Sequence, residues 1–184
     1  MNTTITAEKD LTAEGAEEIR AIQNAAFTNQ PLFVHQRWYG IELADDDLWF
    51  GVRREGRLVA SVRVLHRRIL TPRGELTVGG IGNVCSHPAA RGTGAAKACM
   101  RAVGDYLTGG GQVDFGMLFG GHAVHDFYAS LGWEDIDNEL ASLNADGERR
   151  VHPASGQGHT MIYPGRKPLS EWPTGQIDLN GHAW

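Results

Sequence analysis

The chain has 184 residues, enough for one domain with a sizeable core, and 41% of them are apolar and 21% charged. Acidic residues outnumber basic ones by 22 to 17, which argues against nucleic acid or an anionic membrane as a partner and leaves room for a cationic small molecule. No apolar run approaches the roughly 18 residues that span a bilayer, and the start lacks a signal-peptide pattern. We therefore expect one cytoplasmic domain over residues 1–184.

The first half of the chain alternates helical and strand patterns. It predicts a helix over residues 12–27 and an irregular aromatic segment with a short second helix over 28–40. A hairpin that turns at Glu55–Gly56 follows over 48–74, and a strand interrupted by glycines follows over 75–86. Glycine inside a strand marks a bulge or a close backbone approach.

The second half predicts a helix over residues 94–107, a buried strand over 113–120 and a short helix, ended by Gly132, over 121–133. Polar loops follow over 134–158, and a late strand follows over 159–164. The fold class is therefore α+β, with a mixed, mostly antiparallel central sheet flanked by helices.

The loop "RGTGAA" follows the glycine-interrupted strand and opens a helix. Gly92 and Gly94 lack a Cβ and Ala95 and Ala96 are small, so a pyrophosphate could contact the unpaired N–H groups of the helix start, with Arg91 adding positive charge. The loop lacks the lysine of a Walker motif, and GxGxxG and a βαβ setting are also missing. A glycine-rich turn that only caps the helix is the alternative.

Two motifs resemble the GCN5-related N-acetyltransferase (GNAT) superfamily. The first matches the coenzyme A motif Arg/Gln-x-x-Gly-x-Gly/Ala, at Arg91, Gly94 and Ala96. The second matches a strand followed by a helix that carries Phe-Tyr-x-x-x-Gly-aromatic, at Phe127, Tyr128, Gly132 and Trp133. The resemblance covers roughly residues 5–133.

This resemblance implies acetyl-CoA as the donor and a bulged strand that opens a coenzyme A cleft. The backbone of Val84, Cys85 and Ser86 would pair with the pantetheine arm. The pyrophosphate would lie on the loop formed by Arg91, Gly92, Thr93, Gly94, Ala95 and Ala96. Tyr128 would protonate the departing thiolate during direct transfer; its alternative role is to pack as an aromatic residue of an amphipathic helix.

Three segments resemble the aminoglycoside 2′-N-acetyltransferases more closely: "FYASLGW", "LHRRIL" and "IDLNGHAW". The resemblance implies that the tail, residues 164–184, reaches the acceptor pocket. There the carboxylate and indole of Trp184 could hold a cationic amino sugar. A frayed tail is the alternative.

Three acidic positions of that family are replaced in this chain. Its strand glutamate, a proposed base, corresponds to Gly82, and two aspartates correspond to Gln30 and His182, although Asp178 lies near the latter. Fewer carboxylates suit a less cationic amino sugar, so we expect a resistance enzyme with kasugamycin as the leading acceptor. The acceptor candidates are Gln30, Phe33, Trp38, Tyr39, Gly82, Asn83, Asp178, His182 and Trp184.

The catalytic base stays open. His122 and His125 precede Tyr128 and can titrate near neutrality, but surface or capping roles are the alternative, as is deprotonation through water. Their spacing, and the two cysteines Cys85 and Cys99, match no metal motif, so no metal is expected.

Two other functions remain open. One is acyl transfer to a different amine, such as that of a protein, polyamine or lipo-oligosaccharide, and the other is a non-catalytic acyl-CoA sensor. The sequence also leaves the oligomeric state open, a homodimer included.

Overall fold

The computed structural model describes residues 2–27, 46–156 and 158–184, and these form two compact units. The unit that we call the N-unit holds residues 1–65 and 82–103, and the C-unit holds residues 66–81 and 104–184. Three elements run from one unit into the other: β3 (Arg57–Thr71), β4 (Gly74–Ser86) and α3 (Ala95–Gly109). The single domain expected from the sequence stays a prediction.

The N-unit contains the predicted first helix. After a 3-10 turn, η1 (Glu8–Asp10), the helix α1 spans Ala13–Ala26, and the hydroxyl of Thr12 caps it by accepting the Gly15 N–H at 3.1 Å. Ile19 and Ile22 are the buried residues of this helix and form its apolar face.

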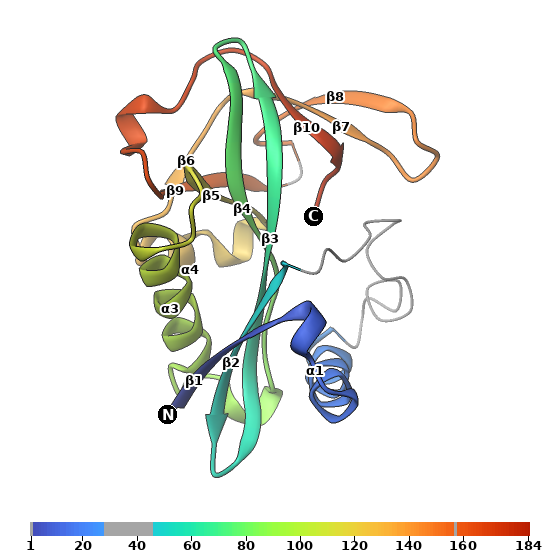
Figure 1. Cartoon of the computed structure of the whole chain (residues 1–184), viewed down its shortest axis with the longest axis vertical. Coiled ribbons are helices and arrows are strands. Elements are labelled where there is room, and N and C mark those ends of the chain that lie inside the picture. Colours follow the sequence, from blue (N-terminus) through green and yellow to red (C-terminus); the bar gives the residue numbers. More distant parts are fainter. Residues whose placement is uncertain (1, 28–45, 157) are drawn as a thin grey trace. The chain divides into compact units, whose positions relative to one another are not determined.

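The sheet of the N-unit is built on the predicted hairpin. β2 (Leu48–Arg54) pairs antiparallel with β3 across Glu55 and Gly56, whose φ angles of +52° and +79° suit a tight two-residue turn. A further strand, β1 (Asn2–Ala7), pairs antiparallel with β2 on its other side (Figure 1). The sequence did not predict β1, because this threonine-rich segment is mostly exposed and lacks an apolar pattern.

The C-unit contains the longer array of strands, in the order β6-β9-β5-β4-β3-β10-β7-β8. Two pairs are parallel, β4 with β5 and β10 with β7, whereas β9 with β5 and with β6, β7 with β8, and β3 with β10 are antiparallel. The mixed, mostly antiparallel sheet is therefore confirmed. The remaining strands span Phe115–Gly120 (β5), Glu134–Asp135 (β6), Glu139–Leu143 (β7), Arg149–Pro153 (β8), His159–Pro164 (β9) and Ile177–His182 (β10).

The prediction of polar loops after Gly132 is wrong in part. β6, β7 and β8 lie there, and β7 buries Leu140 and Ala141 although polar residues surround them. Likewise the tail forms β10, which buries Ile177 and Leu179 and lies beside β7 (Figure 1).

The short elements of the C-unit are the 3-10 turns η4 (His122–Val124) and η5 (Leu169–Glu171) and the helix α4 (His125–Ala129). The helix α4 ends at Ala129, three residues before the predicted stop, and Gly132 closes the following turn with a φ of +88°, a left-handed conformation that glycine adopts without strain. Within the described ranges, no helix is both long and apolar enough to cross a membrane.

Candidate functional site

The second half of β4 is distorted, as the sequence predicted. Asn83 has φ +52°, a left-handed conformation that is uncommon for a residue other than glycine. The ladder between β4 and β5 runs from Val78–Phe115 to Ile81–Leu118, and no strand of the described chain pairs with residues 82–86 on the side away from β3. This backbone edge can accept an extended ligand as an added strand.

Asn83 also carries an unsatisfied polar atom. Its side chain is buried, and its Oδ1 atom has no hydrogen-bond partner among the residues that the structure describes. Leaving a buried carbonyl oxygen without a donor costs about 1–3 kcal/mol, so such an oxygen in a native protein calls for a ligand or an ordered water.

The loop after β4 is shaped by its backbone. A 3-10 turn, η3 (Pro88–Ala90), leads into Gly92 and Gly94, whose φ angles are +75° and +82°. A Cβ at either glycine would meet no atom within 4 Å, so these positions need glycine for its conformation rather than for space. Thr93 fixes the turn by donating its hydroxyl to Ala90 O at 2.7 Å.

The loop ends where α3 starts, at Ala95. The first N–H groups of α3 have no hydrogen-bond partner within the helix, and the helix dipole adds partial positive charge at this end. Arg91 and both glycines are exposed, Thr93 and Ala96 are partly so, and Ala95 is buried. The loop, the open strand edge and the unsatisfied Asn83 oxygen together fit a ligand with an anionic pyrophosphate and an amide-bearing arm, as acyl-CoA has.

Both cysteines of the chain are unsuited to nucleophilic chemistry. Burial raises the pKa of the Cys99 thiol to about 12, and it also raises the pKa of Cys85, whose sulfur lies 3.3 Å from Ser61 Oγ. Because the thiolate is the reactive form, neither residue offers an acyl-cysteine route near neutral pH.

Tyr128 lies in α4 and is buried, with its ring against Gly120 and Phe127. Burial raises the pKa of its phenol to about 12. No described residue is hydrogen-bonded to its hydroxyl. The group therefore keeps its proton at neutral pH and is free to donate it, which a general acid requires.

The Trp184 indole is buried in the C-unit. Its Nε1 donates to Met117 O at 3.3 Å, its ring lies 5.2 Å from the Arg67 guanidinium carbon and 5.1 Å from the Phe119 ring, and a Cβ on Gly80 would approach it within 2.5 Å. The described tail is thus ordered in β10 rather than frayed. An indole packed this way is not an open platform for a sugar, and its predicted contact with the acceptor stays a prediction.

The other two tail candidates have protein partners. Asp178 Oδ2 lies 3.0 Å from Arg149 Nε, and its Oδ1 accepts the Asn180 N–H at 2.8 Å. His182 Nδ1 lies 3.2 Å from Leu143 O. Their predicted contacts with the acceptor are untested, and Arg149 already neutralises part of the charge that Asp178 would offer to an amine.

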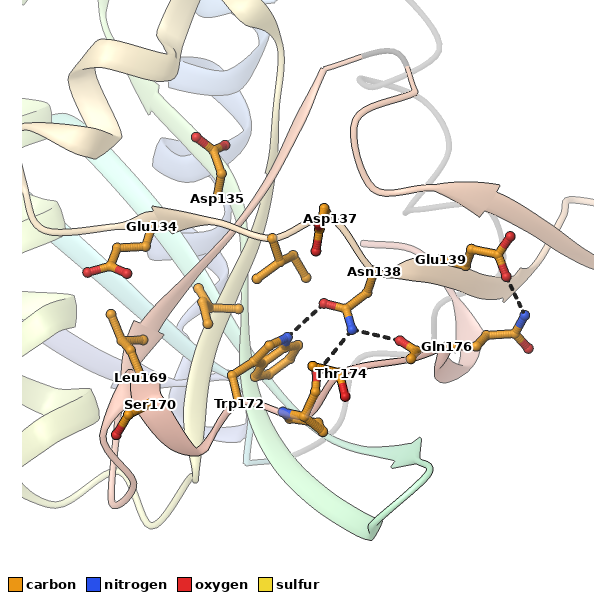
Figure 2. Close-up of a pocket in the computed structure, with 14 residues that line it drawn as sticks. Glu134, Asp135, Asp137, Asn138, Glu139, Leu169, Ser170, Trp172, Thr174 and Gln176 are labelled. Atoms are coloured by element: carbon orange, nitrogen blue, oxygen red, sulfur yellow. Dashed lines mark hydrogen bonds between the residues drawn. The ribbon is translucent and has the colours of Figure 1, made fainter.

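The sequence did not predict a cavity of about 700 Å³ in the C-unit (Figure 2). Four carboxylates line it, and none of its lining residues is basic. These acids are Glu134, Asp135, Asp137 and Glu139. Glu139 is held by Gln176 at 3.3 Å, and Asp135 points away from Trp172 and Asn138.

Asn138 organises one wall of this cavity. It accepts the Trp172 indole N–H at 2.9 Å and donates to the carbonyls of Pro173 and Gly175 at 3.0 and 2.6 Å (Figure 2). The cavity therefore combines a fixed aromatic ring with a lining that carries carboxylates and no basic residue, a combination that suits an organic cation, although Asp135 is already paired with His125 and His159. No short motif could reveal it, because its residues come from two stretches some 30 positions apart.

A family model for the acetyltransferase (GNAT) domain matches residues 8–136, which include the distorted strand, the glycine loop and Tyr128. The chain belongs to the GNAT acetyltransferase family. Acetyl-CoA is the donor that this family binds, and the loop geometry above fits it.

Solved GNAT-like structures share the fold. An acyl-CoA N-acyltransferase from Pseudomonas aeruginosa superimposes with a TM-score of 0.60 at 21% identity, covering 88% of this chain and 98% of that one. A GNAT acetyltransferase from Brucella melitensis in complex with acetyl-CoA gives 0.57 at 16% identity, covering 96% and 94%. The ribosomal-protein-S18-alanine N-acetyltransferase from Escherichia coli gives 0.56 at 15% identity, covering 94% and 99%. No protein with a curated function matches the sequence.

Family membership leaves the acceptor side of this GNAT chain open. Gln30, Phe33, Trp38 and Tyr39, and the short second helix expected near them, lie outside the described residues. Gly82 and Asn83 lie in the distorted part of β4, where Asn83 is buried and Gly82 is half-buried. Their contact with an acceptor stays a prediction.

The two histidines considered as bases belong to a cluster of their own. The hydrogen bonds that His125 donates to the carboxylates of Asp135 and Asp126 raise its pKa, so less of its neutral form is available near neutrality. His122 contacts His159 at 2.9 Å. A base acting through water is the reading that these contacts favour.

Proposed function

We propose that this GNAT enzyme acetylates an amine of a cationic amino-sugar antibiotic of the aminoglycoside type, with kasugamycin as the leading acceptor, and thereby confers resistance. The loop from Arg91 to Ala96 carries the donor half of this proposal, because its left-handed glycines turn the start of α3 into an anion site. Acetylation would remove a positive charge that the drug uses to bind ribosomal RNA, in the cytoplasm where acetyl-CoA is made.

Direct transfer is the mechanism that the side chains favour. Acetyl-CoA supplies the activated acetyl thioester when bound. The edge of residues 84–86 would orient the donor through backbone hydrogen bonds, and Tyr128 would hold the proton that the departing thiolate needs. The high thiol pKa of Cys99 and Cys85 argues against an enzyme-bound acyl intermediate.

The charge of the C-unit supports a cationic acceptor. The acidic cavity beside Trp172 offers carboxylates without a competing lysine or arginine among its lining residues. In contrast, the replacements at Gly82, Gln30 and His182 remove three acids that the aminoglycoside 2′-N-acetyltransferases have. A moderately charged amino sugar suits this balance better than a drug with four or five amines.

A thiol-release assay with a panel of amines, followed by mass spectrometry, tests the proposal. The panel contains kasugamycin, gentamicin, spermidine and an N-terminal alanine peptide. We expect coenzyme A release and a single acetyl addition with kasugamycin. Turnover with gentamicin but not kasugamycin would overturn the choice of acceptor, and turnover with spermidine or the peptide alone would overturn the amino-sugar class. Acetyl-CoA binding without any turnover would favour a sensor.

A further inference from the structure

Three histidines and one aspartate of the C-unit gather outside the donor loop. Asp135 contacts two of them, with Oδ2 at 2.7 Å from His125 Nε2 and Oδ1 at 3.0 Å from His159 Nδ1. The second nitrogen of His159, Nε2, lies 2.9 Å from His122 Nδ1. The ligand atoms of His125, Asp135 and His159 all lie within 4.8 Å of one another.

The sheet topology brings these side chains together from three distant stretches. β5 and β9 pair so that His159 lies opposite Gly120, and η4 then places His122 two residues further on. β6 pairs with β9 through Asp135 and Met161. The backbones of residues 158 and 120 lie so close together that a Cβ on Gly158 would be 2.2 Å from the carbonyl oxygen of Gly120.

The donor set is the one that borderline divalent metals prefer. Neutral imidazole nitrogens and a carboxylate oxygen bind zinc at about 2.0–2.2 Å in a tetrahedral arrangement. Tetrahedral ligands at that bond length lie about 3.3 Å apart, so the spacings of 2.7 and 3.0 Å between Asp135 and the two histidines His125 and His159 need only small side-chain rotations to admit an ion.

The cluster also has a supporting contact and an entry path. Asp126 Oδ1 lies 3.2 Å from His125 Nδ1, which orients the ring so that Nε2 faces Asp135. Such a carboxylate behind a ligating histidine is the usual second partner in metal sites. The side chains of His125 and His159 are 28% and 26% exposed and that of Asp135 is 48% exposed, so a hydrated ion can reach them.

We propose that His125, Asp135 and His159 bind one divalent transition-metal ion, with zinc favoured and water as the fourth ligand, while His122 contacts the other nitrogen of His159 and orients that ring. The sequence alone predicted no metal, because the spacing of His122 and His125 carries no signal without the two distant ligands. The site would connect α4, β6 and β9. Since His125 opens the helix that contains Tyr128, the metal would stabilise the segment that presents this tyrosine.

Tag-free protein, treated with chelator and then titrated with Co²⁺, tests the site. We expect one ion per chain, a visible absorption band typical of tetrahedral cobalt, and displacement by Zn²⁺ with a rise in melting temperature. His159→Ala and Asp135→Asn should each weaken Co²⁺ binding about 10- to 100-fold. His152→Ala, a histidine of β8 outside the cluster, is the matched control and should bind like the parent chain.

Circular dichroism of the metal-free variants separates ligand loss from misfolding, since the conservative Asp135→Asn leaves the carboxylate's shape in place. A chain that binds Co²⁺ no better than a His159→Ala/Asp135→Asn double variant would overturn the proposal, and the four side chains would then be a hydrogen-bonded surface network. Zinc content measured on protein purified without chelator gives an independent check.

Discussion

The donor loop and the histidine cluster are built in opposite ways. The loop is made by backbone: two left-handed glycines, the start of α3 and an open strand edge within residues 82–96. The cluster and the acidic cavity are made by side chains that arrive from separate strands and turns. A backbone site should therefore be sensitive to conformation and tolerant of side-chain changes elsewhere, whereas a side-chain site should depend on individual atoms.

The largest effect on catalysis is expected from removing one atom in the C-unit. Tyr128→Phe deletes the phenol oxygen while its ring still packs against Gly120, so we expect kcat to fall about 100-fold or more with donor binding unchanged. Because the phenol pKa is about 12, loss of its proton should not limit the parent enzyme until the pH approaches that value.

Steady-state kinetics and coenzyme A titration across pH measure this effect. Tyr163→Phe, in which a second tyrosine of the C-unit beside Trp133 loses the same atom, is the control and should keep its turnover. An unaltered kcat in Tyr128→Phe would assign this residue to packing alone.

The next effect comes from a conformational change in the loop. Gly94→Val forces a β-branched residue into φ +82°, at a cost of about 1–3 kcal/mol, so we expect coenzyme A to bind about 10- to 100-fold more weakly by calorimetry. Gly110→Ala, where a Cβ also meets open space, should leave binding intact. Equal affinity in the two variants would show that the loop does not need its left-handed glycines.

A third prediction concerns the packed tail. Trp184→Ala removes a buried indole and should lower the stability of the fold by about 3–5 kcal/mol, measured by denaturant unfolding. Gly80→Ala should displace the same ring and cause a similar but smaller loss. If the tail also contacts the acceptor, both variants should raise the acceptor KM with little change in donor affinity; an unchanged KM would limit Trp184 to packing.

The smallest effect is expected away from both sites. The hydrogen bond from Arg53 lowers the pKa of the Glu18 carboxyl in the folded protein. The pair therefore stabilises the fold at any pH above the carboxyl's unfolded-state pKa. This contribution is lost as the pH falls through the lower folded-state pKa. Both side chains are about one-third exposed, so Glu18→Gln should cost only about 0.5 kcal/mol near neutrality and nothing in acid. Donor and metal binding should not change, and a loss of either would reveal long-range coupling.

The sequence predicted the backbone-built region well. The helix capped by Thr12, the hairpin turn at Glu55–Gly56, the distorted strand at Asn83 and the glycine loop all have local signals, because glycine, capping residues and alternation act within a few positions. β1 and β8 were missed since their short segments are polar and partly exposed, and β7 was missed since its buried pair, Leu140 and Ala141, is too short to give an alternating pattern.

The side-chain-built sites escaped sequence reasoning for a different reason. His159 joins His122 only because β9 pairs with β5, and Asn138 meets Trp172 across 34 positions of chain. Which strands pair, and in which register, depends on residues far apart in the sequence, so a short stretch of sequence does not predict it. The acceptor set predicted from resemblance stays a prediction.

The interleaving of the two units limits how the protein can be cut or rearranged. Because residues 66–81 and 82–103 alternate between the units, the chain crosses from one to the other three times, twice inside strands and once inside a helix. No single truncation yields either unit alone, because residues 1–103 still include 66–81 of the C-unit and residues 66–184 still include 82–103 of the N-unit. Deletion mapping therefore cannot assign donor or metal binding to one unit by itself, and insertions or circular permutation belong in the turns at Glu55–Gly56 and Ala145–Gly147, where strands of a single unit are joined.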